Sequence, residues 1–205
     1  MNQMNHASNA PSSTDSTDSL DKTLRQIGEL WLKNPPDGVT FGGLTSDARG
    51  SGMRKNSNKP MLDLIPVRIW LSIFRRKIPN HCNQSLLTCV YALSDFQEHK
   101  ISGREMIAAV PSEWMIDAAR VLEYGTGKYA PWNWLKGFQW SVPMGCALRH
   151  AYAIIMDGEH LDEESGLSHR GHIVANMIML ATLSDTFPEG DDRPPQSWFE
   201  SGAAQ

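Results

Sequence analysis

The 205-residue sequence lacks the features that would place it in a membrane, outside a cell or on duplex DNA. No apolar run reaches the roughly 20 residues that a transmembrane helix needs, which excludes an integral membrane protein. The N-terminal segment has neither a basic region nor an apolar stretch, so we expect no secretory signal peptide. The formal net charge is −4, whereas a protein dedicated to binding duplex DNA has a broad basic surface, so we do not expect such a protein. We therefore expect a cytoplasmic protein with neither a membrane nor duplex nucleic acid as its partner.

Cysteine is also scarce, and its spacing matches no metal-binding motif. The three residues, Cys82, Cys89 and Cys146, are odd in number, which favours reduced thiols. A disulfide between Cys82 and Cys89 is the alternative. A zinc site built from His81, Cys82 and Cys89 would lack a fourth ligand.

Alternating polar and apolar runs and internal repeats are absent as well, so the predicted fold class is all-α. We expect a compact helical domain with long polar loops and a disordered N-terminal tail, because the first residues have almost nothing to bury. The predicted parts are a disordered tail (1–18), a short helix and flexible loop (19–58), an all-α nucleotide hydrolase-like domain (59–187) and a loose C-terminal tail (188–205).

Three helices are predicted with clear boundaries in the second half of the chain. The first begins at Pro111-Ser112-Glu113 and ends at Gly125 and Gly127. The second runs from Pro143 to Met156 and the third from about Ser168 to Leu183. The two loops between these helices are aromatic (128–137) and acidic (157–166).

The third helix carries polar residues on a stripe that is expected to be buried. At 100° per residue, His169, His172 and Asn176 lie within about 60° of one another. Apolar residues cover most of the rest of the helix, and a buried polar group without a partner costs about 1–3 kcal/mol. Two histidines and an asparagine on one stripe favour a functional site over hydrogen-bonded core histidines.

The second helix adds Arg149 and His150. His150 shares its face with small or apolar neighbours. Arg149 lies about 100° away, where a buried guanidinium needs a bidentate anion. That anion is either a structural carboxylate or a phosphate.

Five carboxylates lie in the loop between these two helices: Asp157, Glu159, Asp162, Glu163 and Glu164. Oxygen ligands beside imidazoles suit a hard divalent cation such as Mg²⁺ or Mn²⁺. The alternative is a loop whose charges are simply solvated.

The aromatic loop offers groups that could bind a nucleotide. Tyr129, Trp132 and Trp134 can stack on a base, and Asn133 can pair with a base edge or a sugar hydroxyl. Lys128 and Lys136 can reach phosphates. The alternative is that these aromatic side chains belong to the core.

Together these motifs resemble the phage dATP/dGTP diphosphohydrolase N-terminal domain family, which is grouped with the all-α, MazG-type nucleoside triphosphate pyrophosphohydrolases. The resemblance rests on the following runs: Lys59 to Pro66, Leu122 to Tyr129, Asn133 to Gly137, Ala147 to His150, Gly158-Glu159, Asp162 to Leu167 and His169 to Asn176.

The sequence departs from this pattern in two ways. About 40 residues (67–110) separate the first run from the rest, which predicts an insertion. MazG-type enzymes hold their metal ions with paired E-x-x-E and E-x-x-D carboxylates on helices, whereas here Glu159-x-x-Asp162 lies in a loop.

The resemblance implies hydrolysis of purine deoxynucleoside triphosphates (dATP or dGTP) to the monophosphate and pyrophosphate by a homo-oligomer, in the host cytoplasm if a phage encodes it. It implies Mg²⁺ or Mn²⁺ as cofactor, held by Glu159, Asp162, Glu164 and His172. The catalytic residues would be His150, His169 and Glu164. The substrate-binding residues would be Lys128, Tyr129, Asn133, Trp134, Lys136, Arg149 and Asn176.

Two other functions remain open at this point. The His and Asp content is also typical of an HD-type phosphohydrolase, which would release tripolyphosphate. The chain could equally be a non-catalytic nucleotide-binding or assembly protein with structural histidines.

Overall fold

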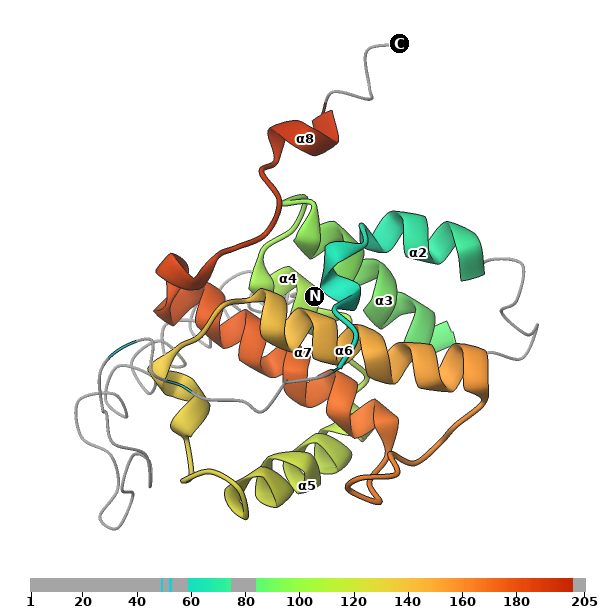
Figure 1. The fold of residues 1–205 in the computed structure, drawn as a ribbon, viewed down its shortest axis with the longest axis vertical. Coiled ribbons are helices and arrows are strands. Elements are labelled where there is room, and N and C mark those ends of the chain that lie inside the picture. Colours follow the sequence, from blue (N-terminus) through green and yellow to red (C-terminus); the bar gives the residue numbers. More distant parts are fainter. Residues whose placement is uncertain (1–48, 50–51, 53–58, 75–83, 201–205) are drawn as a thin grey trace, which may run out of the picture. The chain divides into compact units, whose positions relative to one another are not determined.

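The computed structural model describes Arg49, Gly52 and residues 59–74 and 84–200 (Figure 1). Every regular element within these residues is helical, which confirms the all-α prediction. The expected disordered tail (1–18) and nearly all of the expected short helix and flexible loop (19–58) lie outside the described residues, as do His81 and Cys82. No helix in the described part of the chain is long and apolar enough to cross a bilayer.

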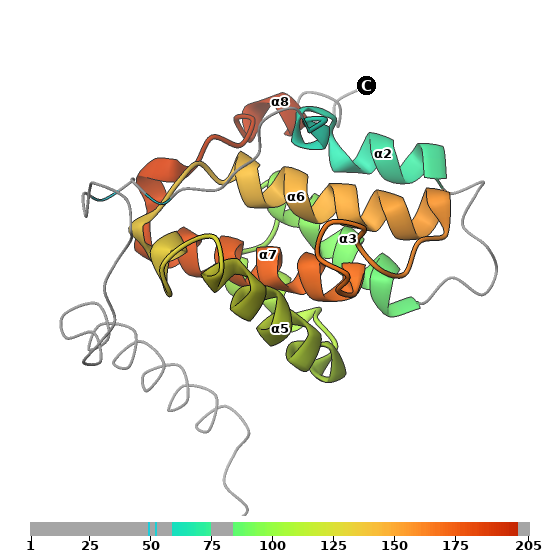
Figure 2. The ribbon, with the colours of Figure 1, turned by 60° about the horizontal axis from the view of Figure 1, so that its bottom comes forward.

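The centre of the fold is an antiparallel helical hairpin. It is formed by α6 (Ser141–Tyr152) and α7 (His169–Thr186), which pack along each other. Helix α7 is buried over most of its length because apolar residues surround it on nearly every side. Figures 1 and 2 show α7 between α6 and α5 (Met115–Thr126). The predicted boundaries of these three helices agree with the structure to within a few residues.

Three further helices precede α5 in the described part of the chain and complete the core. They are α2 (Val67–Phe74), α3 (Gln84–Gln97) and α4 (Gly103–Ala108). Helix α3 packs against α2, α4 and α6, and α4 packs against α7. The described part of the segment 67–110, which is predicted to be an insertion, is therefore built into the core.

Short 3₁₀ elements lie among these helices. They are η1 (Leu62–Leu64), η2 (Ser112–Trp114), η3 (Asn133–Lys136) and η5 (Pro188–Gly190). The 3₁₀ element η1 lies against α6 and brings the preceding Lys59-Pro60 to the same side of the hairpin. Cys89 and Cys146 are free thiols, and burial raises the pKa of Cys89 to about 11.

Residues 188–194 are anchored to the core, although a loose tail was expected from residue 188. The Asp192 carboxylate accepts hydrogen bonds from the backbone N–H (2.8 Å) and hydroxyl (2.5 Å) of Ser141, where α6 begins. The Arg193 guanidinium donates to the Phe96 carbonyl (2.6 Å) and lies over the rings of Phe96 and Trp140. These contacts join residues far apart in sequence, so local composition could not predict them. A short helix, α8 (Ser197–Glu200), follows.

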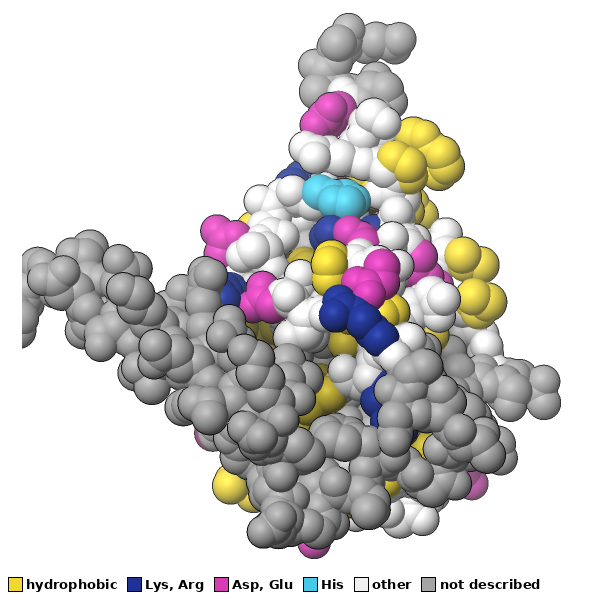
Figure 3. Space-filling model, turned by 90° about the vertical axis from the view of Figure 1, so that its left-hand side faces the viewer, with side chains coloured by type: hydrophobic (Ala, Val, Ile, Leu, Met, Phe, Trp, Pro, Cys, Tyr) yellow, Lys and Arg dark blue, Asp and Glu magenta, His cyan; other side chains and the backbone are white. Residues whose placement is uncertain are grey.

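Charged side chains of both signs lie side by side where described residues are visible in Figure 3. Several basic side chains form ion pairs with acidic ones, as in Arg104–Asp185 and Arg193–Asp191. This arrangement agrees with the low net charge of the sequence.

Candidate active site

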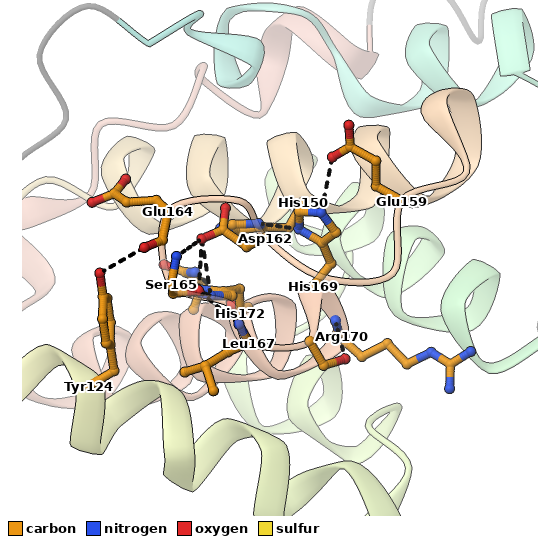
Figure 4. A network of polar contacts seen from close by, with 12 residues as sticks. Tyr124, His150, Glu159, Asp162, Glu164, Ser165, Leu167, His169, Arg170 and His172 are labelled. Atoms are coloured by element: carbon orange, nitrogen blue, oxygen red, sulfur yellow. Dashed lines mark hydrogen bonds and ion pairs between the residues drawn. The ribbon is translucent and has the colours of Figure 1, made fainter.

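Three histidines meet where α6 approaches the first turn of α7. His150 lies near the end of α6, while His169 and His172 lie at the start of α7 (Figure 4). The Nδ1 atoms of His150 and His169 are 2.8 Å apart, and the rings of His150 and His172 stack with centroids 4.2 Å apart. His169 and His172 are buried. The predicted histidine stripe of α7 therefore faces the histidine predicted on α6.

The loop between these helices is folded so that Asp162 points toward the histidines. A short π-helix, η4 (Ala153–Asp157), follows α6, and Gly158 adopts a positive φ of 71° directly after it. Asp162 and Leu167 are joined by a 2.8 Å backbone hydrogen bond, which closes the loop before α7. Ser168 then caps α7 by accepting from the Arg170 N–H. The loop is thus fixed at both ends of the acidic segment.

A serine that the sequence reasoning did not single out orients both Asp162 and His172. The Ser165 hydroxyl and backbone N–H donate to Asp162 Oδ2 at 2.7 and 2.9 Å. Because that hydroxyl has one proton, the 2.8 Å contact between Ser165 Oγ and His172 Nε2 has the imidazole N–H as donor. The D-x-x-S spacing of an Asx-type turn is the signal that could have identified Ser165.

The ligand atoms of His150, Asp162 and His169 lie within 4.8 Å of one another, a spacing at which one ion could contact all three. His150 comes from α6, Asp162 from the acidic loop and His169 from α7. Glu159 lies beside them: its carboxylate accepts from His169 Nε2 at 3.4 Å. Histidines that bind metals usually donate their other ring N–H to a carboxylate in this way, which fixes the tautomer and raises the basicity of the ligand.

The surroundings keep these groups in the protonation states that a cation needs. Burial, together with the neighbouring His172, lowers the pKa of His150 to about 2, so its imidazole is neutral at physiological pH. Burial raises the pKa of Asp162, but hydrogen bonds from Ser165 and the nearby histidines outweigh that effect and lower it overall. The site therefore offers a neutral imidazole and an ionised carboxylate.

Glu164, predicted as a metal ligand and catalytic residue, is held elsewhere. Its carboxylate pairs with Lys59 (3.0 Å) and Lys128, and these two cations lower its pKa to about 2. Tyr124 donates to the Glu164 backbone carbonyl at 3.3 Å. Figure 4 shows the Glu164 side chain directed away from the three histidines. Lys59 is a second residue that the sequence reasoning missed, although it opens one of the motif runs.

The aromatic loop borders a cavity of about 270 Å³ at the end of α5. Its walls include three predicted substrate-binding residues, Tyr129, Asn133 and Trp134, together with Trp132. Met179 of α7 closes the cavity on the side of the hairpin. The loop is shaped by backbone at positive φ, at Trp132 (63°) and Gly137 (89°).

Three other predicted substrate-binding residues lie outside both the histidine cluster and the cavity lining. Arg149 donates to the carbonyl of Pro60 at 2.9 Å, beside the half-buried carboxylate of Asp63. Asn176 is fully buried and donates to the His172 carbonyl at 2.6 Å. Lys136 is buried in η3. Arg149 thus ties the segment before η1 to α6.

Comparison with known proteins shows what much of this region is similar to. Residues 94–193 match the family described as dATP/dGTP diphosphohydrolase, N-terminal. A dATP/dGTP diphosphohydrolase of Salmonella phage PMBT28 is 28% identical over 91 residues. That alignment covers 44% of this chain and 31% of the phage protein, so the chain matches about a third of its relative's length. No solved structure matches the chain.

The matched range contains the whole histidine cluster, the acidic loop and the aromatic cavity. It begins inside the segment 67–110, so the expected insertion stays a prediction for the residues before the match. The resemblance of this sequence to the dATP/dGTP diphosphohydrolase N-terminal family is thereby confirmed over residues 94–193.

Proposed function

We propose that this protein hydrolyses dATP or dGTP between the α- and β-phosphates, with a divalent cation, to give the deoxynucleoside monophosphate and pyrophosphate. The observation that carries the proposal is the shared position of the His/Asp cluster and the aromatic cavity on one helix. His172 stacks on His150 of the cluster, and Met179 lines the cavity. These two residues are seven positions apart on α7, which places them on the same face, about 10 Å apart along the axis. A nucleotide is long enough to place its base in the cavity and its phosphates at the cluster.

The donor set is suited to a divalent cation. His150, Asp162 and His169 offer two imidazole nitrogens and a carboxylate oxygen within 4.8 Å of one another. Mg²⁺ prefers oxygen ligands, whereas imidazoles suit the transition metals, so of the two ions predicted from the sequence this set favours Mn²⁺. A bound cation would neutralise phosphate charge and lower the pKa of a bound water.

The residues around the cluster would keep these donors in place. Glu159 holds the Nε2–H of His169, and Ser165 holds Asp162 Oδ2. The low pKa of His150 makes it a weak general base but a ready ligand, because it loses no proton on binding a cation. We therefore assign His150 and His169 to cation binding rather than to proton transfer, and His172 to positioning through Ser165.

The cavity would take the base. Its volume of about 270 Å³ is close to the lower limit for small-molecule pockets, which suits a nucleobase rather than a whole nucleotide. Tyr129 and Trp134 provide aromatic surface for stacking. Asn133 provides a polar group that can distinguish base edges.

The same donor set favours a second function. Histidine and aspartate ligands are typical of HD-type phosphohydrolases, and such an enzyme would release tripolyphosphate and the free deoxynucleoside. The two reactions use the same substrate and the same kind of cation but break different P–O bonds. Their products therefore separate them.

The test is to incubate the protein with dGTP or dATP and Mn²⁺ and to resolve the phosphate products by ion-exchange chromatography. We expect pyrophosphate and the matching monophosphate, with no reaction in EDTA. Asp162→Asn serves as the control for contaminating phosphatases and should lose more than about 100-fold in turnover. Tripolyphosphate as product would support the second function, and no product from either nucleotide would contradict both.

A further inference from the structure

Two lysines from distant parts of the chain converge on one carboxylate beside the cluster. Lys59 Nζ lies 3.0 Å from Glu164 Oε2, and Lys128 Nζ contacts Oε1 of the same side chain. Lys59 precedes η1, and Lys128 follows α5. Lys128 also lies over the ring of Tyr124, 4.8 Å from its centroid. Each ammonium group thus takes one oxygen of a single anion.

This arrangement leaves an excess of positive charge that solvent can reach. Two ammonium groups face one carboxylate, and the side chains of Lys59 and Lys128 are 48% and 40% exposed. The carboxylate between them is itself exposed, so solvent can also reach the place that it occupies. An anion with more charge than a carboxylate would complement these lysines better.

The position of the lysines links the two halves of the proposed site. Lys128 lies between the cavity-lining residues Thr126 and Tyr129. Its partner, Glu164, is two residues from Asp162 of the cation cluster (Figure 4). A chain of phosphates between the cavity and the cluster would therefore pass the lysine pair.

We propose that Lys59 and Lys128 bind the phosphate chain of the nucleotide, and that Glu164 takes the place of phosphate oxygens on these lysines until the nucleotide binds. One lysine on each carboxylate oxygen is also how two lysines would hold two non-bridging oxygens of a phosphate. Glu164 is then a competing internal anion rather than a metal ligand. This inference rests on the proposed nucleotide site but not on its being catalytic.

The experiment uses inorganic tripolyphosphate as the probe, in EDTA so that no cation mediates binding, and measures affinity by calorimetry. Lys59→Met and Lys128→Met should each weaken tripolyphosphate binding about three- to tenfold, since each removes one charge-assisted contact at an exposed site. Binding of deoxyguanosine, which has no phosphate, should not change. Glu164→Gln should tighten tripolyphosphate binding by a similar factor, because it removes the competing anion.

Lys100→Met is the matched control, since Lys100 is an exposed lysine paired with Glu98 on another part of the surface. It should bind tripolyphosphate as the wild type does. The inference is overturned if the wild type does not bind tripolyphosphate, if the two lysine variants bind it normally, or if Glu164→Gln weakens it. The last result would mean that Glu164 orders the loop or holds a ligand itself.

The outcomes also separate this inference from the proposed reaction. Lysine-dependent tripolyphosphate binding in a protein that hydrolyses neither dATP nor dGTP supports the phosphate site and contradicts only the hydrolase. Hydrolysis with an unchanged KM in Lys59→Met and Lys128→Met contradicts the phosphate site and leaves the hydrolase standing.

Discussion

His150 and His169 contact each other through their Nδ1 atoms, which lie 2.8 Å apart across the α6–α7 hairpin. One Nδ1 must donate and the other accept. Because Glu159 accepts from His169 Nε2, a neutral His169 has its proton there, and its Nδ1 is the acceptor. His150 then donates from Nδ1. Glu159, on the exposed side of the loop, thus determines the proton arrangement of a part-buried pair.

Removing one of these imidazoles should remove cation binding. His169→Gln keeps a polar side chain of similar size but loses a nitrogen ligand of the cluster. We expect its Mn²⁺ affinity to fall by more than about 100-fold, because losing only the group that hydrogen-bonds to a metal ligand already costs about 10–100-fold in such sites. Calorimetric titration with Mn²⁺ measures this, and circular dichroism checks that the helices persist.

The control for that variant is His160→Gln. His160 lies in the same loop, but its side chain is exposed and takes no part in the cluster. Its Mn²⁺ affinity should equal that of the wild type. Equal losses in both variants would show that the cluster of His150, Asp162 and His169 is not the cation site.

The partly buried imidazole of His150 should make the cation-free protein less stable in acid. Its pKa is lowered to about 2 in the folded state by burial and by His172, against about 6.5 in the unfolded chain. Unfolding therefore takes up a proton below pH 6.5, and the free energy of unfolding falls as the pH drops, by at most about 1.4 kcal/mol per pH unit. The full stability is present above pH 6.5.

Urea unfolding in EDTA between pH 7 and pH 4.5 measures this dependence. His150→Gln cannot take up the proton, so its free energy of unfolding should vary less steeply with pH over this range. Carboxylates titrate mainly below the range, which keeps Asp162 out of the comparison. Identical pH dependence in both proteins would contradict the assignment of a neutral His150 with a lowered pKa.

The close approach of α5 to α7 depends on Gly171. A Cβ added there would lie 2.6 Å from the carbonyl oxygen of Asp117, a backbone atom that cannot rotate away. Gly171→Ala should therefore lower the free energy of unfolding by about 1–3 kcal/mol, even though alanine favours the helix.

Gly125→Ala is the matched control for that substitution. Gly125 also lies in a helix, but an added Cβ would meet nothing within 4 Å. The substitution should leave the free energy of unfolding unchanged or raise it by up to about 1 kcal/mol, with an unchanged or higher melting temperature. Thermal melts followed by circular dichroism compare the two, and a stabilised Gly171→Ala would rule out the close crossing.

The local signals of the sequence predicted the helices well. The third helix was expected to start at about Ser168, which caps α7 in the structure, and the first to end at Gly125 and Gly127, where α5 ends. Such boundaries are predictable because helix initiation and termination depend on a few neighbouring residues. The stripe of His169 and His172 follows from helical geometry alone. These features needed no knowledge of what packs against them.

The partners of the side chains could not be predicted in this way. Helical geometry placed Arg149 about 100° from His150, but only the folded chain shows that it contacts the Pro60 carbonyl. Glu164 and Asp162 looked equivalent in an acidic loop. In the structure Ser165 orients Asp162, whereas two lysines from other segments hold Glu164. Such choices depend on contacts across long sequence separations.

The cavity beside the aromatic loop yields the last prediction, on substrate affinity. Trp134 borders the cavity and is tilted against Trp132, with ring centroids 6.5 Å apart. Trp134→Leu keeps an apolar side chain but removes the surface on which a base would stack, a contact worth about 1–3 kcal/mol. We expect the KM for dGTP to rise by about 5- to 100-fold.

The dissociation constant for deoxyguanosine should rise by a similar factor, because the lost contact is with the base and not with the phosphates. Tripolyphosphate binding should not change. Trp198→Leu is the control, since Trp198 is 70% exposed on α8 and does not line the cavity. If Trp134→Leu binds deoxyguanosine as tightly as the wild type, the base binds elsewhere and the cavity is only a packing defect between α5 and the aromatic loop.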